Sequence, residues 1–185
     1  MMGPEVGVVV GSDSDLPVVQ DTCKMLEQLG IAYEVKIASA HRTPEKAVAY
    51  ARAAVERGLQ VIIAAAGGAA HLPGVLAAHT CLPVIGLPIQ TGALDGLDAL
   101  YSMVQMPAGV PVATVTINGA KNAALLAARM IGMANLTVRE RLIRYNKDLA
   151  RQVEAEAARL AELGIAEYLA FRQHQKLKRE LGHHD

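Results

Sequence analysis

Ser39, His41 and Arg42 stand directly after an apolar run, residues 31–38, that is typical of a β-strand. The threonine and proline that follow predict the start of a helix, with Thr43 as its N-cap. Polar side chains at such a junction lie at the edge where open α/β sheets bind ligands. Arginine binds phosphate or carboxylate groups, and histidine transfers protons near neutral pH. The segment therefore predicts a binding or catalytic loop, with a solvated loop and an ordinary N-cap as the alternative.

A second loop, Gly-Ser-Asp-Ser-Asp, follows the β-branched run at residues 6–10. Its glycine allows close backbone approach, and the hydroxyls of Ser12 and Ser14 stand at a predicted helix N-terminus, which favours a bound phosphate. Asp15 either caps that helix or accepts hydrogen bonds from sugar hydroxyls. The loop lacks both the Gly-Lys-Ser/Thr ending of a P-loop and a Gly-x-Gly-x-x-Gly pattern. A small monophosphate therefore fits better than a nucleoside triphosphate or a dinucleotide.

A third loop, residues 67–74, follows the predicted strand at 61–66 and is rich in glycine and alanine. Its backbone amides are free to approach a flat ligand, and His71 adds one titratable group. The alternative for His71 is a capping or core histidine. No third strong metal ligand is spaced suitably near His41 and His71, so we expect no metal site.

The order of predicted elements brings the three loops together. Strands alternate with helices along the chain, which predicts a parallel sheet with right-handed crossovers and helices on both faces. In a doubly wound sheet the carboxyl ends of the strands meet at one edge, so the loops are expected to share one cleft. The predicted strands are 6–10, 31–38, 61–66, 83–87 and 111–117. The predicted helices are 15–29, 44–57, 97–103 and 120–134, with a further short helix that follows the third loop and ends near residue 79.

The chain changes character after Asn135. Residues 136–163 form one charged helical stretch, Gly164 interrupts it, and a final helix is expected at 165–181. This division predicts an α/β catalytic domain at 1–134 and a helical extension at 135–185. This helical extension cannot join the sheet, and its amphipathic pattern predicts packing on a neighbouring subunit, with packing on its own domain as the alternative.

Composition narrows the class of protein. The 185 residues carry no net formal charge, so nothing points to a nucleic-acid partner. The chain is 52% hydrophobic but only 3% aromatic, which predicts a core of Ala, Val, Leu and Ile. Cys23 and Cys81 lie in apolar stretches and are expected to be buried, reduced thiols. The N-terminus lacks the features of a signal peptide and no apolar run could span a membrane, so a cytoplasmic protein is expected.

Five blocks of the sequence together resemble the 5-(carboxyamino)imidazole ribonucleotide mutase family of de novo purine synthesis. The resemblance implies a flavodoxin-like three-layer α/β/α sandwich with a five-stranded parallel sheet and a C-terminal helical extension. It also implies a homo-octamer whose active sites lie at subunit junctions. The matching blocks are GSDSD (11–15), SAHRTP (39–44), AGGAAHLPG (66–74), YSMVQMPAGVPVAT (101–114) and NAALLAA (122–128).

The resemblance assigns roles to the residues of the three loops. His41 matches the general acid/base, while Ser12, Asp15 and Arg42 match the set that binds the phosphate and ribose of the ribonucleotide substrate. Ser14 and Ser39 are neighbours of that set. The implied reaction uses no metal, ATP or biotin, and carbon dioxide exists only transiently. It would be enclosed by Gly67, Gly68, Ala69, His71 and Leu72.

Two alternatives stay open at this point. Lys121 and the short loop at 117–122 resemble the sister class, which carboxylates aminoimidazole ribonucleotide directly with carbon dioxide. The AHRTP and GGAAHLPG segments favour the mutase. A flavodoxin-like phosphate- or flavin-binding module is the non-enzymatic alternative. Flavin binding is disfavoured because the chain has one Phe and no Trp to enclose a flavin. A receiver domain is disfavoured because glycine follows the strand at 61–66, where a receiver would carry a phosphoacceptor aspartate.

Overall fold

Five parallel strands form one sheet in the computed structural model, which describes residues 3–180, with side chains as far as Lys178. The strand order is β2-β1-β3-β4-β5, the doubly wound order of flavodoxin-like proteins, as predicted. The strands are β1 (Val6–Val10), β2 (Tyr33–Ile37), β3 (Val61–Gly67), β4 (Val84–Ile89) and β5 (Ala113–Thr114).

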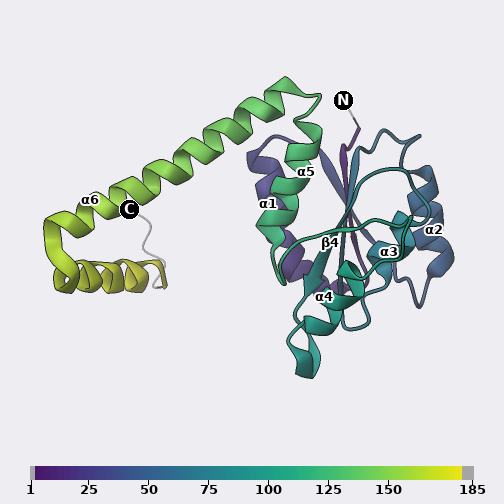
Figure 1. Ribbon diagram of the computed structural model, residues 1–185, viewed down its shortest axis with the longest axis horizontal. Coiled ribbons are helices and arrows are strands. Elements are labelled where there is room, and N and C mark those ends of the chain that lie inside the picture. The colour runs from purple at the N-terminus through teal and green to yellow at the C-terminus, as the bar shows by residue number, and fades with distance from the viewer. Residues whose placement is uncertain (1–2, 181–185) are drawn as a thin grey trace. The chain divides into compact units, whose positions relative to one another are not determined.

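Helices cover both faces of the sheet, which confirms the three-layer sandwich (Figure 1). Helices α1 (Leu16–Gln28) and α5 (Ala120–Ile131) pack together on one face. The other face carries α2 (Pro44–Ala53), α3 (Leu72–Ala77) and α4 (Leu97–Val104). Two short 3₁₀ segments, η1 (Asp13–Asp15) and η2 (Gly92–Leu94), follow β1 and β4.

Small side chains fill the core, as the composition predicts. Helix α5 buries Ala123, Ala124, Ala127 and Ala128 completely, so its backbone lies close to its neighbours. On the opposite face, alanines of α2 pack beneath residues of β3, in one cluster with Leu72, Leu76 and Met103. Such close packing of helices on the sheet leaves few voids and holds the strand ends in fixed positions.

Several element ends and two environments differ from the sequence predictions. Helix α2 stops at Ala53 instead of residue 57, and Val55 in the turn that follows is 49% exposed. The predicted fifth strand, residues 111–117, pairs with β4 only at Ala113–Thr114, because it lies at the edge of the sheet. Cys81 is exposed and Cys23 is only half-buried, so the prediction of two buried thiols was wrong.

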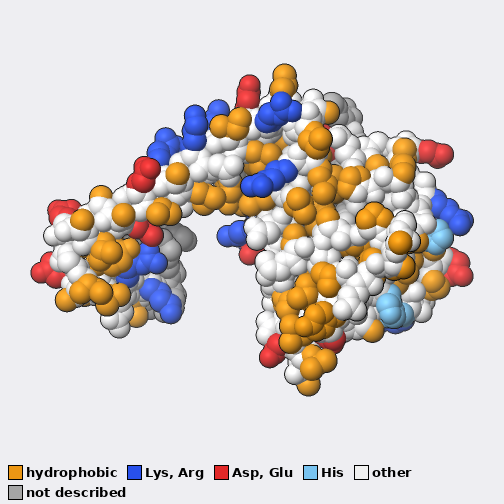
Figure 2. Space-filling model, viewed as in Figure 1, with side chains coloured by type: hydrophobic (Ala, Val, Ile, Leu, Met, Phe, Trp, Pro, Cys, Tyr) orange, Lys and Arg blue, Asp and Glu red, His pale blue; other side chains and the backbone are white. Residues whose placement is uncertain are grey.

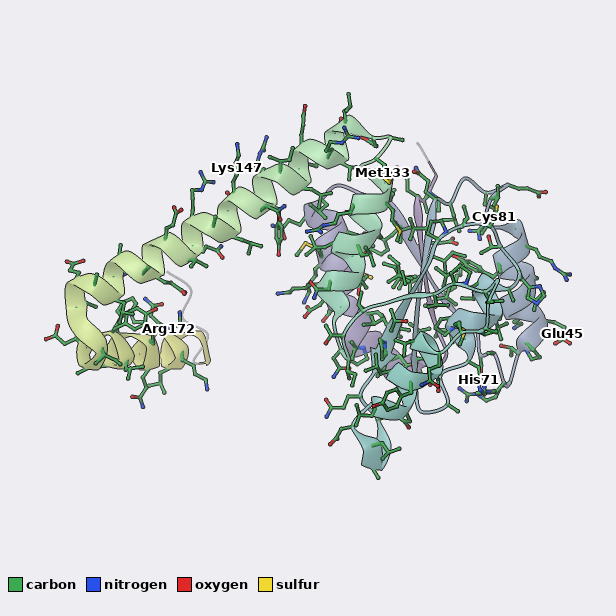
Figure 3. The ribbon with its side chains drawn as sticks, viewed as in Figure 1. Glu45, His71, Cys81, Met133, Lys147 and Arg172 are labelled. Atoms are coloured by element: carbon green, nitrogen blue, oxygen red, sulfur yellow. The ribbon has the colours of Figure 1, made fainter. Side chains whose placement is uncertain are left out.

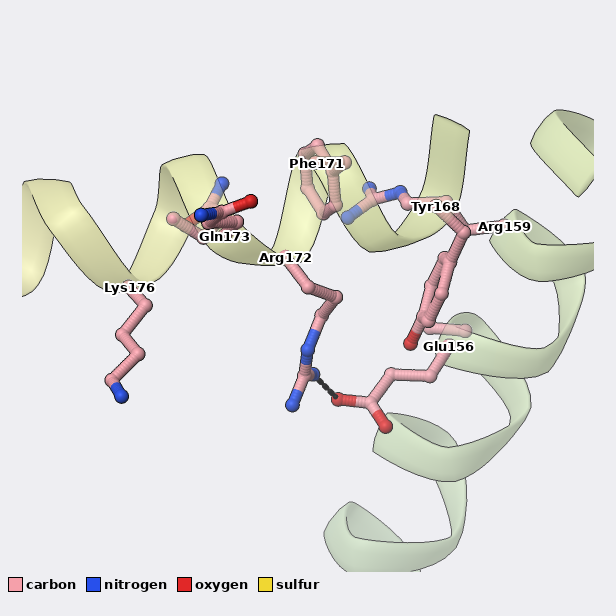
Figure 4. Close-up of a pocket in the computed structure, with 9 residues that line it drawn as sticks. Glu156, Arg159, Tyr168, Phe171, Arg172, Gln173 and Lys176 are labelled. Atoms are coloured by element: carbon pink, nitrogen blue, oxygen red, sulfur yellow. Dashed lines mark hydrogen bonds and ion pairs between the residues drawn. The ribbon is translucent and has the colours of Figure 1, made fainter. Parts of the chain in front are cut away.

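The chain divides into two compact units, with the boundary between Leu142 and Ile143. Helix α6 (Leu136–Glu180) contains one non-helical residue, Gly164, at φ 70° and ψ 168°, which confirms the predicted interruption there. The predicted helix end at Leu181 lies outside the described residues. In the second unit the segments before and after Gly164 contact each other through Arg172 and Glu156, 2.7 Å apart, and through Arg159 over Phe171 (Figure 4).

Two arginines in the first turns of α6 donate hydrogen bonds to backbone carbonyls at the C-terminal ends of α1 and α5. Arg141 Nη1 donates to the carbonyls of Leu29 and Gly30, at 2.7 and 3.1 Å, where α1 ends. Arg139 donates to the carbonyls of Gly132 and Met133, where α5 ends. A cation at a helix C-terminus satisfies free carbonyls and complements the helix dipole. The start of α6 is therefore tied to the α/β body.

We expect Arg141→Ala to lower the free energy of unfolding by about 2 kcal/mol, because two charge-assisted hydrogen bonds are lost, a half-buried one to the Leu29 carbonyl and an exposed one to the Gly30 carbonyl. Chemical denaturation of the variant and the wild type measures the difference. Arg144→Ala, an exposed arginine one turn further along α6, is the matched control. An equal loss in both variants would contradict a capping role for Arg141.

Candidate functional site

One cavity of about 380 Å³ lies at the carboxyl edge of the sheet, where the three predicted loops meet. All the residues predicted for the site line it, so the expectation of one shared cleft is confirmed. The cavity wall also includes three residues that the sequence analysis did not assign: Ala40, Ala66 and Thr91. The full lining is Gly11, Ser12, Ser14, Asp15, Ser39, Ala40, His41, Arg42, Ala66, Gly67, Gly68, Ala69, His71, Leu72 and Thr91.

Hydrogen bonds fix the loop that carries His41 and Arg42. The Arg42 amide donates to Ser39 Oγ at 3.1 Å, and Arg42 Nη2 donates to the Gly11 carbonyl at 3.3 Å. Thr43 occupies the N-cap position of α2, but its hydroxyl donates to the Ser39 carbonyl and accepts from the Ser39 amide. Thr43 is thus the N-cap residue, as predicted, but its side chain makes no capping hydrogen bond; the hydroxyl instead closes the loop that presents the histidine.

His41 and His71 form a direct pair across the cavity. His41 Nε2 and His71 Nδ1 are 2.5 Å apart, and the two rings meet edge to face with centroids separated by 4.8 Å. Figure 3 shows His71 at the same edge of the sheet as the start of α2, where Glu45 is labelled. One hydrogen fits between the two nitrogens, so one of these nitrogens donates and the other accepts. While the bond lasts, the pair therefore carries at most one positive charge.

Asp15 lies at the floor of the cavity and is only 6% exposed. Burial raises the pKa of its carboxyl above the usual range, and hydrogen bonding by the Ser12 backbone and the Ser14 hydroxyl partly offsets this rise. Its side chain makes no capping hydrogen bond to α1 among the described residues. The capping alternative for Asp15 is thus not supported, and its carboxyl lines the cavity instead.

Gly67 is required by the close approach of Thr91. A Cβ at position 67 would lie 2.7 Å from both Cγ2 and Oγ1 of Thr91, so any larger residue would displace that side chain. Gly68 adopts φ +60°, a conformation that side chains with a Cβ disfavour. The glycine pair therefore shapes a narrow wall lined by backbone and a single hydroxyl.

Thr91 is the functional candidate that the sequence analysis missed. It follows β4, whose carboxyl end reaches the same edge as the ends of β1 and β3, and this position was the available signal. The loop is held by Asn118, which accepts from the Gln90 amide at 3.0 Å and donates to the Gln90 side chain at 3.2 Å. Lys121 is exposed on α5 and does not line the cavity.

The residue types in the cavity suit an organic phosphate ligand and proton transfer. Among the described residues, no group of three or more His, Cys, Asp or Glu side chains could hold a metal ion. No helix in the described part of the chain is long and apolar enough to cross a membrane. The chemical groups at hand are one guanidinium, several hydroxyls, one buried carboxyl and the histidine pair.

The chain is similar over most of its length to known proteins of one family. Residues 5–152 match the family model described as AIR carboxylase. The N5-carboxyaminoimidazole ribonucleotide mutase of Pyrococcus horikoshii is 58% identical over 167 residues, which cover 90% of this chain and 94% of that protein. The chloroplastic phosphoribosylaminoimidazole carboxylase of Vigna aconitifolia is 54% identical over 164 residues, 89% of this chain but 29% of that protein. The crystal structure of PurE from Treponema denticola superposes with a TM-score of 0.78 at 30% identity, covering 85% of this chain and 98% of that one.

We expect Asp15→Asn to be more stable than the wild type at pH 7. Asp15 ionises at a higher pH in the folded than in the unfolded protein, so its stabilising contribution is present at low pH and is lost as the pH rises through the folded pKa. The difference in stability between Asp15→Asn and the wild type should therefore shrink as the pH falls. Denaturation of both proteins at several pH values tests this, with Asp21→Asn, an exposed site on α1, as the control. A variant less stable than the wild type at pH 7 would contradict it.

Proposed function

Because this chain belongs to the AIR carboxylase family, we propose that it is an N5-carboxyaminoimidazole ribonucleotide mutase of de novo purine biosynthesis. The enzyme is an isomerase: it moves the carboxyl group of its substrate from the exocyclic nitrogen to carbon four of the imidazole. The observation that carries this proposal is the histidine pair, which lies between the Arg42 loop and the glycine loop at Gly67 in one cavity.

The residues of the three loops orient the substrate by its phosphate and its sugar. Arg42 and the hydroxyls of Ser12 and Ser39 bind the phosphate, since guanidinium and hydroxyl groups are its usual partners in proteins. Asp15 accepts hydrogen bonds from the ribose hydroxyls. These contacts place the imidazole ring next to the histidine pair and the glycine loop.

The reaction then needs one proton, which His41 donates to the substrate and later takes back. The bond between the exocyclic nitrogen and the carboxyl carbon breaks, carbon dioxide is released, and the nitrogen receives a proton from His41. Carbon dioxide stays in the pocket formed by Gly67, Gly68, Ala69, His71 and Leu72, where its proximity to carbon four favours attack. Carbon four bonds to it, and His41 removes the carbon-four proton to restore aromaticity.

The geometry of the histidine pair suits this proton balance. His71 accepts from or donates to His41 at 2.5 Å, so the pair exists either neutral or with one extra proton. That single extra proton is the one that the substrate nitrogen takes and carbon four gives back. His71 is thereby a positioning residue as well as part of the carbon dioxide pocket.

The direct carboxylase is the second candidate, because Lys121 resembles that class. Lys121 is exposed and absent from the cavity wall, whereas the residues of the AHRTP and GGAAHLPG segments line it. The Vigna aconitifolia carboxylase also matches over 29% of its own length, whereas the Pyrococcus horikoshii mutase matches over 94%. Both findings favour the mutase.

The mutase is further proposed to be a cytoplasmic homo-octamer, with residues 135–185 packing on neighbouring subunits. Exposed apolar side chains support an assembly of copies. Leu97, Tyr101 and Val104 are exposed at helical spacing on α4, and Leu94 is exposed in the turn before it, in the apolar patch of Figure 2. Val153 and Leu169 are likewise exposed on α6. Buried in an interface, such side chains would contribute through the hydrophobic effect.

His41→Asn is expected to lower kcat by at least about 100-fold, because general acid–base catalysis is lost, while binding of the ribonucleotide stays within a fewfold of the wild type. His71→Asn should lower kcat less, since it removes only the partner of His41. Steady-state kinetics and a binding assay with the carboxylated product measure both effects. His79→Asn, outside the cavity, is the control. Normal turnover by His41→Asn would overturn the assignment.

The choice of substrate separates the two enzyme classes. We expect the purified protein, without ATP, to convert the carboxyamino substrate in degassed buffer, followed by the absorbance of the 4-carboxylated product. With aminoimidazole ribonucleotide and modest bicarbonate, turnover should be poor. Efficient turnover in the second reaction would instead identify the direct carboxylase and direct attention to Lys121.

A further inference from the structure

A second hollow of about 480 Å³ adjoins the site cavity and shares Gly11, Ser12, Ser39 and Arg42 with it. The additional residues that line this hollow are Asp13, Ile37, Thr43 and Lys46. Arg42 and the two serines therefore form a common wall, with the histidine pair on one side and Lys46 on the other.

The charges of the two spaces differ. In the cavity, the positive charge of Arg42 faces the carboxyl of Asp15. The hollow has Arg42 and Lys46 against a single carboxylate, Asp13, which leaves a net charge of about +1. Asp13 is also engaged locally, because it accepts hydrogen bonds from the Ser12 hydroxyl at 2.9 Å and the Ser14 amide at 3.1 Å.

Lys46 makes no ion pair among the described residues. It is exposed in the first turn of α2. A monoester phosphate carries a charge of about −1.5 to −2 at pH 7, more than one guanidinium neutralises. Arg42 in addition donates to the Gly11 carbonyl, so only part of its hydrogen-bonding capacity is free.

We propose that Lys46 is a substrate-binding residue, and that the phosphate of the ribonucleotide lies in the hollow between Arg42 and Lys46. This inference rests on the proposed function for the identity of the ligand. The phosphate then lies across the common wall from the histidine pair, with the ribose beside Asp15. Lys46 acts on binding by its charge and touches none of the reacting atoms.

The test uses the full chain and two measurements. We expect Lys46→Ala to raise KM for the carboxyamino ribonucleotide roughly threefold to tenfold, as a partly solvated charge contact predicts, with kcat within about twofold. The dissociation constant of ribose 5-phosphate, measured by calorimetry at low salt, should rise by the same factor. Binding of ribose, which lacks the phosphate, should not change.

Two variants control for charge and position. Lys46→Arg should restore both constants, and Arg52→Ala, which removes an exposed cation from the last turn of the same helix, should leave both unchanged. Unchanged ribose 5-phosphate binding in Lys46→Ala would overturn the inference, as would wild-type protein that binds this probe no better than ribose. If the wild type lacks mutase activity but binds ribose 5-phosphate through Lys46, the proposed function fails while the phosphate site stands.

Discussion

The register of the three adjacent strands β2, β1 and β3 is the constraint on which the site depends. Val10 at the end of β1 is opposite Ile37 in β2 and Ala65 in β3, so the loops that follow these three strands leave the sheet side by side. The pairing continues past the strands, because Ala38 donates to the Val10 carbonyl at 2.9 Å and Gly11 to the Ala65 carbonyl at 3.3 Å. A shift of one residue in any strand would move its loop and turn its side chains to the other face.

Close packing of small side chains keeps this register in place. Strand β1 is fully buried, and its Gly7 lies so close to the Tyr50 hydroxyl that a Cβ there would overlap it. Tyr50 in turn donates to Glu34 at 2.8 Å, and Arg57 pairs with the same carboxylate, which ties α2 and the turn after it to the edge strand β2. The pKa of Glu34 is lowered by hydrogen bonds from Arg57 and Tyr50, against the opposing effect of its burial. The loop with His41 is thus supported from both of its flanking elements.

The sequence was sufficient for the parallel sheet with helices on both faces and for the shared cleft, because both follow from polar residues placed after apolar runs in an alternating α/β chain. It was insufficient for the hydrogen-bond partners of individual side chains, because these depend on the tertiary structure. The hydroxyl of Thr43 bonds to Ser39 instead of capping α2, and His41 meets His71, which is 30 positions away. Thr91 lay in a glycine-rich loop without an obvious reactive group, so its contact with Gly67 could not be read from residue types.

In the proposed mechanism, substrate binding and proton transfer depend on different charged groups of the site. Cations lie on the side of Arg42, the buried carboxyl of Asp15 lies at the floor, and the histidine pair lies against the glycine loop. Burial of Asp15 costs stability at neutral pH. In the proposed mechanism this carboxyl gains hydrogen-bond donors when the ribose hydroxyls bind. Because the proposed reaction takes up no net proton, the histidine pair needs to carry only one proton beyond its neutral state. Its hydrogen bond limits the pair to that one extra proton.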